Sequence, residues 1–521
     1  MLSHRRTRLA RSLGVVALAG AGMYAADRSN SHIYSRSLRV FGTGAAVVVD
    51  YRRQFKGTTK DDPEYRTKLS ALNQRIADRL LHLCFLNGGI YTKFGQQLAT
   101  FNHGLPKEYT QTLAALQDRA KPVPFEVAKR TIEAELGRPW TEVFSEFDRE
   151  PIAAASLAQV HRAIDREGRE VAVKVQYPHL AAQMHSDLAV IQWAFRLTEY
   201  FFPDVQIQWM FPEFERALTA ELDFENEKKN SRRIAACFRD NSAVHVPAVY
   251  DELSSKRMLT MEFIHGPKIS QVNAIQDLGL DPTHVARELC EVFSEMIFLH
   301  GFVHCDPHAG NIFVRANPDT SAPVKEQLVL LDHGLYRELD TEFRKTYCDL
   351  WRAVLMRDAK LLQDCGERLN VGEFATFLPL ILTYRPISHK GRLDASMSTA
   401  EREKLKEQLK NMRAADVWDF MEQLPRDMLF VFRTNNMIRA LNKDLGGSTR
   451  DRFSIMGRYA VQGHTNFYSL NQPSDVGVLG RVKYWWDHSN LVVRLRVVDY
   501  VMSLVQYVRG ADNGVKLKHV G

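Results

Sequence analysis

Two short segments carry the residue types that a phosphoryl-transfer reaction needs. The first, His304–Asn311, reads HCDPHAGN and places Asp306 five residues before Asn311. The second, Leu330–Gly334, reads LLDHG and places Asp332 at the end of an apolar run. One carboxylate could accept the proton of the nucleophile, while an amide oxygen and a second carboxylate could hold Mg²⁺ against the phosphates. We therefore interpret Asp306 as a candidate base, and Asn311 and Asp332 as candidate metal ligands.

A lysine upstream has a place in the same chemistry. Lys174 lies in REVAVKVQ, where alternation predicts a strand that buries Val171, Val173 and Val175 and turns the lysine to the other face. The segment looks like the kinase strand V-A-I-K, whose lysine reaches the α- and β-phosphates. Such a lysine needs a carboxylate to fix its direction, and the acidic segment Glu221–Glu227 offers candidates. Lysine, glutamate, aspartate, asparagine and aspartate then follow in kinase order.

The elements that position these residues are predicted from periodicity and turn residues. Apolar residues recur at helical spacing from Leu69 to Leu83, and the pattern stops at Asn87-Gly88-Gly89. A hairpin with its turn at 165–168 contains Lys174, and a second hairpin is predicted from residues 245–253 and 257–264. Further helices are predicted at residues 187–201, 283–300, 342–356, 359–369, 373–383 and 399–413.

Composition and charge exclude several classes of protein. The 521 residues are 45% hydrophobic and 25% charged, a globular composition with room for two or three domains. The net charge of +7 is spread among acids, which argues against nucleic-acid binding and mildly favours an anionic membrane surface. The six cysteines lie far apart without a Cys-x-x-Cys pair, so neither a disulfide framework nor a zinc site is indicated.

The first 30 residues have the composition of a targeting segment. Four arginines occur among the first 11 residues, and no acidic residue precedes Asp27. This pattern favours a mitochondrial transit segment. The apolar run at residues 13–26 is short for a bilayer span. A secretory signal is the alternative, which the cysteine pattern disfavours.

Six motifs follow one another over about 240 residues. They are KFGQ at Lys93–Gln96, AAASLAQVH at Ala153–His161, VAVKVQ around Lys174, ELDFENE at Glu221–Glu227, HCDPHAGN at His304–Asn311 and LLDHG at Leu330–Gly334. Together they resemble the UbiB or AarF-domain atypical kinase family, and the Arg-rich start and the tail resemble its mitochondrial AarF-domain-containing kinase branch. The resemblance implies an α+β, protein-kinase-like two-lobed fold, with an N-terminal helical extension packed over the active site and a helical C-terminal tail.

The resemblance also implies roles for single residues, with ATP and Mg²⁺ as cofactors. It assigns Lys174 to the nucleotide phosphates, Glu227 to the lysine as its ion-pair partner, Asp306 to the catalytic base, and Asn311 and Asp332 to the metal. Lys93 and Gln96 take the KxGQ positions of the family, and Glu221 and Asp223 its ExD positions, which face one another across the site. Without the family, the same lysine and acids would be interpreted as solvated helix faces.

An alanine-rich segment stands where protein kinases have a glycine-rich loop. It includes Ala153, Ala154, Ala155 and Ser156. Glycines let the backbone fold closely over phosphates, whereas alanines make such a loop stiffer and more helix-prone. We therefore expect phosphate positioning and nucleotide selectivity to differ from those of ordinary kinases. The alternative is a plain helix that begins near Ser156.

Two histidines of the candidate catalytic loop allow a competing metal interpretation. His304 and His308 are four residues apart, but Pro307 disfavours a helix between them and no third ligand follows. We expect both to hold the loop by hydrogen bonds. Downstream of Gly334 no Ala-Pro-Glu element appears, so docking of a peptide in the manner of ordinary kinases is doubtful.

The sequence therefore predicts five segments: 1–30, targeting or membrane-proximal; 31–150, a helical extension; 151–265, a small lobe; 266–446, a large lobe; and 447–521, a tail that lies on a membrane or packs on the lobe. We expect a mitochondrial atypical kinase or ATPase, associated with the inner membrane, that binds nucleotide and supports lipid or coenzyme Q homeostasis. Two alternatives remain: a pseudokinase scaffold that acts through protein partners at the inner membrane, and a membrane-associated lipid-binding protein.

Overall fold

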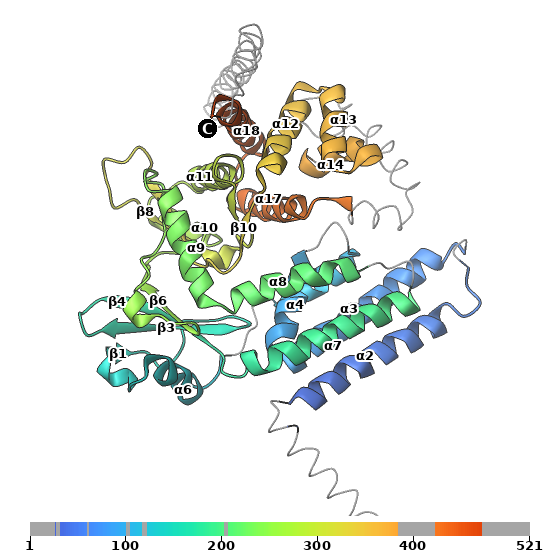
Figure 1. Cartoon of the computed structure of the whole chain (residues 1–521), viewed down its shortest axis with the longest axis horizontal. Coiled ribbons are helices and arrows are strands. Elements are labelled where there is room, and N and C mark those ends of the chain that lie inside the picture. The colour runs from blue at the N-terminus through green and yellow to red at the C-terminus, as the bar shows by residue number, and fades with distance from the viewer. Residues whose placement is uncertain are drawn as a thin grey trace, which may run out of the picture. The chain divides into compact units, whose positions relative to one another are not determined.

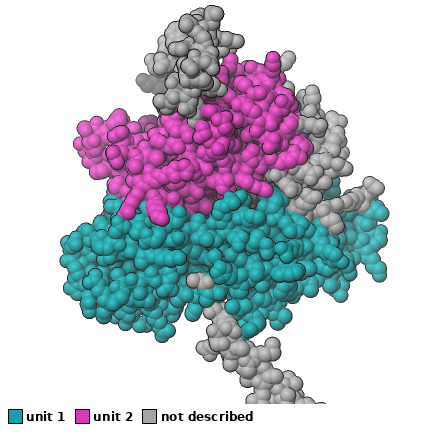
Figure 2. Space-filling model, in the orientation of Figure 1, with its two compact units in different colours: residues 1–228, 248–264 teal, residues 229–247, 265–521 magenta. Residues whose placement is uncertain are grey.

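A computed structural model of the protein describes residues 27, 32–59, 62–100, 105–116, 122–202, 207–383 and 423–470 (Figure 1). The chain divides into two compact units, which Figure 2 shows in different colours. Unit 1 comprises residues 1–228 and 248–264, and unit 2 comprises residues 229–247 and 265–521. Lys174 and the KFGQ segment belong to unit 1, while Asp306, Asn311 and Asp332 belong to unit 2.

Unit 1 contains an antiparallel sheet that carries Lys174. Its strands are β1 (Phe144–Phe147), β2 (Ala153–Ala154), β3 (Ala158–Asp165), β4 (Glu170–Gln176) and β6 (Met258–Glu262), in the order β1-β3-β4-β6 with β2 paired to β3. The hairpin predicted around residues 165–168 is confirmed as β3 and β4. The valines of β4, Val171, Val173 and Val175, are at most 1% exposed and pack with α6 (Phe125–Leu136) in one apolar core. Burial of this face holds the strand in register and turns Lys174 to the other side.

The remainder of unit 1 is helical. The helices are α2 (Ile33–Gln54), α3 (Tyr65–Asn87), α4 (Gly89–Thr100), α5 (Lys107–Leu113), α7 (Leu180–Phe201), α8 (Phe211–Glu221) and the beginning of α9 (Phe224–Cys237). The predicted stop after Asn87 is confirmed, since Gly88 adopts a φ of 64° at the end of α3. Residues from α2, α3, α4, α5, α7 and α8 share one apolar core.

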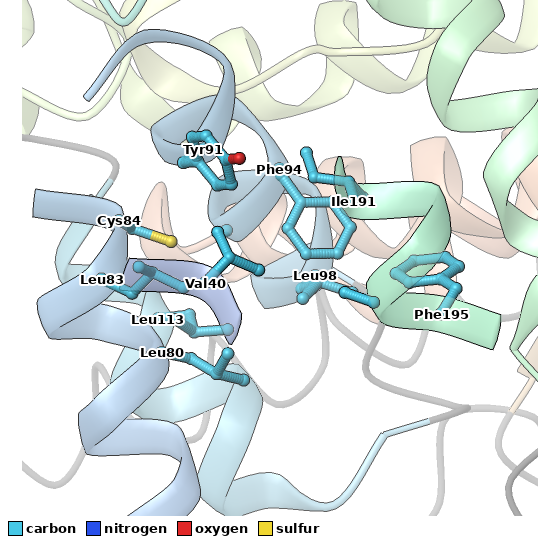
Figure 3. Close-up of a pocket in the computed structure, with 12 residues that line it drawn as sticks. Val40, Leu80, Leu83, Cys84, Tyr91, Phe94, Leu98, Leu113, Ile191 and Phe195 are labelled. Atoms are coloured by element: carbon cyan, nitrogen blue, oxygen red, sulfur yellow. The ribbon is translucent and has the colours of Figure 1, made fainter. Parts of the chain in front are cut away.

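An apolar cavity of about 70 Å³ lies within this helical part of unit 1 (Figure 3). Side chains from five helices line it, among them Val40, Leu83, Phe94, Leu98 and Phe195. Phe94 belongs to the KFGQ segment and also packs edge-on against Phe214 of α8, with ring centroids 5.0 Å apart. The KFGQ helix is therefore anchored by its apolar side as well as by its polar residues.

The second predicted hairpin is confirmed in part, since Val249 and Met261 form an antiparallel bridge and the Tyr250 backbone donates to the Thr260 carbonyl at 3.0 Å. The beginning of its first segment pairs elsewhere. Val244–His245 forms β5, which pairs in parallel with β9 (Glu326–Leu330) of unit 2. Residues 251–253 form a 3-10 turn before β6, with the hydroxyl of Ser254 accepting a hydrogen bond from the Thr260 backbone at 3.0 Å. An alternating pattern predicts a strand but does not specify its partner, and here the partner lies about 80 residues downstream.

Unit 2 consists of helices with two small sheets. The strands are β7 (Phe302–His304) paired with β10 (Tyr336–Glu338), and β5, β9 and β8 (Ile312–Ala316) in that order. The helices are α10 (Val272–Asp277), α11 (Pro282–Glu295) with a π-helical turn at Met296–His300, α12 (Thr341–Met356), α13 (Ala359–Arg368), α14 (Leu378–Thr383), α17 (Arg426–Asp444) and α18 (Thr449–Leu470). Short 3-10 segments occur at Ala309–Asn311 and Gly372–Phe377.

Most of the predicted helices of unit 2 are confirmed within one to three residues of their ends. Asp281 caps α11 by accepting a hydrogen bond from the Thr283 backbone, with Pro282 at the first helical position. The predicted helix at 399–413 lies outside the described residues. Part of the predicted tail forms α18, which packs on α11 and α12, while residues 471–521 lie outside the described part. Among the described helices, none combines the length and the apolar character needed to cross a bilayer.

Candidate active site

The candidate nucleotide-binding lysine forms a buried ion pair within unit 1. Lys174 Nζ lies 2.7 Å from Glu227 Oε1 and 2.9 Å from Oε2. The Glu227 side chain is 1% exposed and that of Lys174 14% exposed. Burial of either charge without a partner would destabilise the fold, so each of the two buried groups depends on the other. The structure thus brings together the lysine and the glutamate that the resemblance pairs.

Lys93 of the KFGQ segment contacts one acid of the ExD pair. Its Nζ lies 2.7 Å from Glu221 Oε2, and both side chains are 12% exposed. Asp223 does not join them in the described structure. Its carboxylate instead accepts a hydrogen bond from the Glu225 backbone at 3.1 Å and caps the beginning of α9. The expectation that Lys93 meets both acids therefore holds for Glu221 and is wrong for Asp223.

The last two residues of KFGQ fit tightly against their neighbours. A Cβ added to Gly95 would lie 2.3 Å from Leu116 Cδ1 and 3.0 Å from Cys84 Sγ, so any larger residue would require the Leu116 side chain to shift. Gln96 donates through Nε2 to the Leu116 carbonyl at 2.9 Å and accepts from the Ser156 hydroxyl at 3.4 Å. The KFGQ helix therefore contacts the alanine-rich segment.

The alanine-rich segment is a strand and turn, so the alternative interpretation as a helix start is wrong. Ala153 and Ala154 pair with Val160 and Gln159 of β3. The turn closes where the Ala155 backbone donates to the Ala158 carbonyl at 2.8 Å. Pairing with β3 overrides the helix propensity of alanine, because the strand bonds satisfy backbone groups that a helix would otherwise satisfy.

In unit 2, Asp306 lies at the beginning of a tight loop. The Asp306 carbonyl accepts from the His308 backbone at 2.8 Å and from Asn311 Nδ2 at 3.1 Å. His308 Nδ1 accepts from the Gly310 backbone at 3.0 Å, and His304 Nδ1 accepts from the Asp306 backbone at 3.1 Å. The structural roles predicted for the two histidines are confirmed. Among the described residues, no cluster of histidine, cysteine and acidic side chains could hold a metal ion.

Asn311 and Asp332 are positioned together by a backbone hydrogen bond. The Leu331 backbone donates to the Asn311 carbonyl at 2.9 Å, which places Asp332 next to the loop. Asn311 uses its amide nitrogen within the loop, so its Oδ1 is the side-chain atom that could bind a metal ion, and Asp332 Oδ1 accepts from Gly334 at 2.9 Å. Amide and carboxylate oxygens are hard ligands of the kind that Mg²⁺ prefers, so the donor set fits that ion.

Three stacked rings, those of His304, His333 and Tyr336, lie within and next to this loop. His304 is fully buried, and burial lowers its pKa from 6.5 to about 4, so the ring is neutral. It stacks on Tyr336 at 5.0 Å, and the Tyr336 hydroxyl lies 3.0 Å from His333 Nδ1. His333, which stands where kinases have phenylalanine, is 3% exposed and also meets the Leu330 carbonyl at 3.0 Å. It therefore combines the packing of a ring with two hydrogen bonds.

The sequence motifs did not single out Arg433 of α17. Its Nη2 lies 3.0 Å from Asp306 Oδ1, with side-chain exposures of 16% and 15%. Nothing in the local sequence RTNNM marks this arginine, since it lies 127 residues after the aspartate. Only the packing of α17 on α11 could have identified it.

The parts described in the two units define a protein-kinase-like fold. An antiparallel sheet holds the Lys–Glu ion pair, and a largely helical unit carries the Asp306–Asn311 loop and a strand that leads to Asp332. The family model described as the ABC1 atypical kinase-like domain matches residues 115–365. The chain belongs to this family of atypical kinases, which includes the AarF domain-containing protein kinases.

Relatives support this assignment over most of the chain. The AarF domain-containing protein kinase 1 of Xenopus laevis is 36% identical over 423 residues, which cover 81% of each protein. The probable serine/threonine-protein kinase abkD of Dictyostelium discoideum is 40% identical over 469 residues, covering 88% of this chain and 66% of the length of that relative. The secreted RxLR effector protein 27 of Plasmopara viticola is 66% identical over 221 residues, covering 42% of this chain and 93% of the effector.

Proposed function

We propose that this protein binds ATP with Mg²⁺ and transfers or hydrolyses the terminal phosphoryl group. The observation that carries the proposal is the ion pair between Lys174 and the buried Glu227. A lysine held on a strand by two carboxylate oxygens has lost most of its rotational freedom before the nucleotide arrives. Its ammonium group can therefore bind the α- and β-phosphates without a further ordering cost.

Residues of unit 2 supply the remaining chemistry in this proposal. Asn311 and Asp332 would hold Mg²⁺, which when bound neutralises charge on the phosphate oxygens. Asp306 would orient the attacking hydroxyl or water and accept its proton as the bond between that oxygen and the γ-phosphorus forms and the bond from this phosphorus to the leaving ADP breaks. The hydrogen bonds that its backbone makes to His304, His308 and Asn311 support the Asp306 carboxylate in a defined position.

Binding is tested first by titrating the full-length protein with ATP in the presence and absence of Mg²⁺ by calorimetry. We expect Mg²⁺-dependent binding, and we expect Asp332→Asn to weaken it by about tenfold or more because a charged metal ligand is lost. Asp277→Asn is the matched control, since Asp277 is an exposed aspartate of α10 in the same unit. Equal affinity of the two variants would overturn the assignment of Asp332.

Turnover separates the enzyme from the scaffold alternative. Release of phosphate from ATP, or labelling of an acceptor, that is present in the natural sequence and absent in Asp306→Asn supports the proposed function. Nucleotide binding with no turnover in either protein would instead favour a pseudokinase that acts through protein partners.

We further propose a mitochondrial location, associated with the inner membrane. The support is the arginine-rich, acid-free start of the chain, with four arginines among its first 11 residues. Fusion of residues 1–30 to a fluorescent reporter tests this proposal, because a transit segment takes the reporter to mitochondria. Entry of the reporter into the secretory pathway would identify the segment as a secretory signal.

We propose a role in lipid or coenzyme Q homeostasis from the resemblance to the UbiB or AarF-domain family and from the membrane association proposed for both ends of the chain. Cells that lack the protein would be complemented with the natural sequence or with Asp332→Asn, and their phospholipids and quinones quantified. We expect the natural sequence alone to restore the altered lipid class. Equal rescue by both proteins would contradict a role that depends on nucleotide chemistry.

A further inference from the structure

Helices α2 and α7 of unit 1 expose a large apolar surface, here called the α2–α7 face. On α2 the exposed side chains are Tyr34, Leu38, Phe41 and Val49, which are 43 to 74% exposed. On α7 they are Trp193, Leu197, Tyr200 and Phe201, which are 38 to 77% exposed. The steps between these side chains are four, three and eight residues on α2, and four, three and one on α7, so at helical periodicity each set lies as a stripe on one side of its helix.

The two stripes belong to neighbouring helices that run in the same direction. Near their beginnings, Arg36 Nε of α2 lies 3.1 Å from Asp187 Oδ1 of α7. Near their ends, the rings of Tyr51 and Phe202 meet edge-on with centroids 4.8 Å apart. The guanidinium of Arg52 lies 6.0 Å from the ring of Phe201, which joins the exposed sides of the helices at this end. Soluble monomers rarely expose apolar stripes of this extent without a binding role.

The basic and acidic side chains of α2 and α7 differ in how far they are exposed to solvent. Within α2 and α7, both in the described part of the chain, the exposed charged side chains are Arg39, Arg52, Arg53 and Arg196. The acidic side chains of the two helices form contacts within unit 1. Asp50 pairs with Arg75 and Arg79, and Asp187 pairs with Arg36. Glu199 accepts hydrogen bonds from the backbones of Ile207 and Gln208. The two helices therefore lack an exposed acid, and Arg52 lies beside Phe201 of the α2–α7 face, while Arg39 donates to Asn87 at the end of α3.

The sequence of the segment that precedes α2 favours a membrane as the partner of the α2–α7 face. Residues 1–26 contain an apolar run at 13–26, led by arginines, and this segment joins α2 almost directly after Asp27. A segment of this composition has affinity for anionic membranes. A membrane that binds it would therefore lie next to the beginning of the α2–α7 face.

We propose that the α2–α7 face binds the surface of a bilayer that contains anionic lipid, with both helices lying in the membrane plane. Tryptophan and tyrosine favour the depth of the lipid headgroups, leucine and phenylalanine reach the acyl boundary, and the arginines contact lipid phosphates. Neither helix is apolar enough to cross the bilayer, which agrees with binding in the plane. This inference names the surface for the membrane association proposed above.

Flotation of the full-length protein with lipid vesicles tests the proposal. Vesicles of phosphatidylcholine with about 30% anionic lipid are compared with vesicles of phosphatidylcholine alone. We expect the protein to float with the anionic vesicles. The double variant Leu38→Asp/Trp193→Asp should lower the ratio of bound to free protein by about tenfold or more, because it places two charges at the membrane surface. Leu38→Ser/Tyr200→Ser should lower it in the same direction with less risk to the fold.

Ile152→Asp is the matched control, because Ile152 is an apolar residue of unit 1 that is 53% exposed and lies outside α2 and α7. It should float like the natural sequence. Equal flotation of the two double variants and the control would overturn the proposal and leave another segment as the anchor. Light scattering tests whether the α2–α7 face binds a second copy of this chain instead. If the double variants convert a dimer to a monomer without a change in flotation, the face is a contact between copies of this chain and the proposal is wrong.

Membrane binding by the α2–α7 face and the proposed catalysis can be tested separately. Asp332→Asn should float like the natural sequence, since Asp332 lies in unit 2. The double variants of the α2–α7 face should retain Mg²⁺-dependent ATP binding. Loss of both ATP binding and flotation in Leu38→Asp/Trp193→Asp would indicate misfolding of unit 1, and the flotation of Leu38→Ser/Tyr200→Ser would then test the proposal.

Discussion

At the scale of single residues, Arg433 is a contact of the candidate catalytic loop that no sequence motif marks. Its guanidinium lies against the Asp306 carboxylate at 3.0 Å, and both groups are largely removed from solvent. A charge-assisted hydrogen bond of this kind restricts the rotation of the carboxylate. We interpret Arg433 as a positioning residue that acts through Asp306.

Replacement of Arg433 by alanine is expected to lower kcat by about tenfold, which corresponds to about 1.4 kcal/mol in the barrier. The KM for ATP should remain unchanged, because Arg433 contacts the candidate base and belongs to neither the lysine pair nor the metal ligands. Steady-state kinetics of phosphate release give both parameters. Arg439→Ala, on the exposed side of the same helix, is the control, and an equal kcat in the two variants would contradict the positioning role.

The neutral His304 predicts a dependence of stability on pH. Its pKa falls from 6.5 to about 4 on burial, so between these values the unfolded chain binds more protons than the folded chain. Stability therefore decreases as the pH falls through this range, by roughly 2 kcal/mol between about pH 7 and pH 5. Urea midpoints at the two pH values measure the change.

His304→Asn supplies the comparison for that measurement. The asparagine oxygen can accept the Asp306 backbone hydrogen bond that Nδ1 accepts in the natural sequence. Since asparagine does not titrate, we expect the variant to lose less stability on acidification than the natural sequence. An identical loss in both proteins would show that other groups cause it.

At the scale of elements, helix α4 connects the KFGQ residues to three parts of unit 1. Lys93 contacts Glu221 of α8, Gly95 packs against Leu116, and Gln96 contacts Ser156 beside the alanine-rich turn. The Gly95→Ala variant should be less stable by about 1–3 kcal/mol, because its methyl group overlaps Leu116 and Cys84. Thermal unfolding measures the loss, and an unchanged midpoint would contradict the packing described for this helix.

Double-mutant cycles distinguish the two acids of the ExD segment. Lys93→Ala combined with Glu221→Ala should show a coupling energy of about 1 kcal/mol or more, since the side chains form a partly buried ion pair. Lys93→Ala combined with Asp223→Ala should be additive, because Asp223 caps α9 instead. Coupling of Lys93 to Asp223 alone would contradict the observed pairing. ATP binding can be measured across the same variants.

Local patterns predicted the elements well where one face is buried. The alternation of Val171, Val173 and Val175 placed Lys174 correctly, and the Gly88 stop ended α3 where expected. Patterns failed where a partner distant in sequence decides the structure. Alanines with high helix propensity became β2 because β3 is available to pair with them, and Val244–His245 joined β9 of unit 2.

At the scale of the whole molecule, the order of motifs is what identifies the protein. Each motif alone is common, but six in family order, a family model over residues 115–365 and relatives that cover most of the chain agree on an atypical kinase. The residues of the candidate site that lie within these motifs could be predicted from the sequence. Arg433 was not, because its role depends on how α17 packs, and no local pattern carries that information.

The central claim is that Lys174, held by Glu227, and the residues around Asp306 each contribute to the transfer or hydrolysis of the terminal phosphoryl group of ATP. The most direct test is Mg²⁺-dependent phosphate release from ATP by the full-length protein, with and without anionic vesicles, beside Asp332→Asn and the control Asp277→Asn. The account predicts turnover in the natural sequence and in the control, and its loss in Asp332→Asn. Equal turnover in all three proteins, or none in any of them, would contradict it.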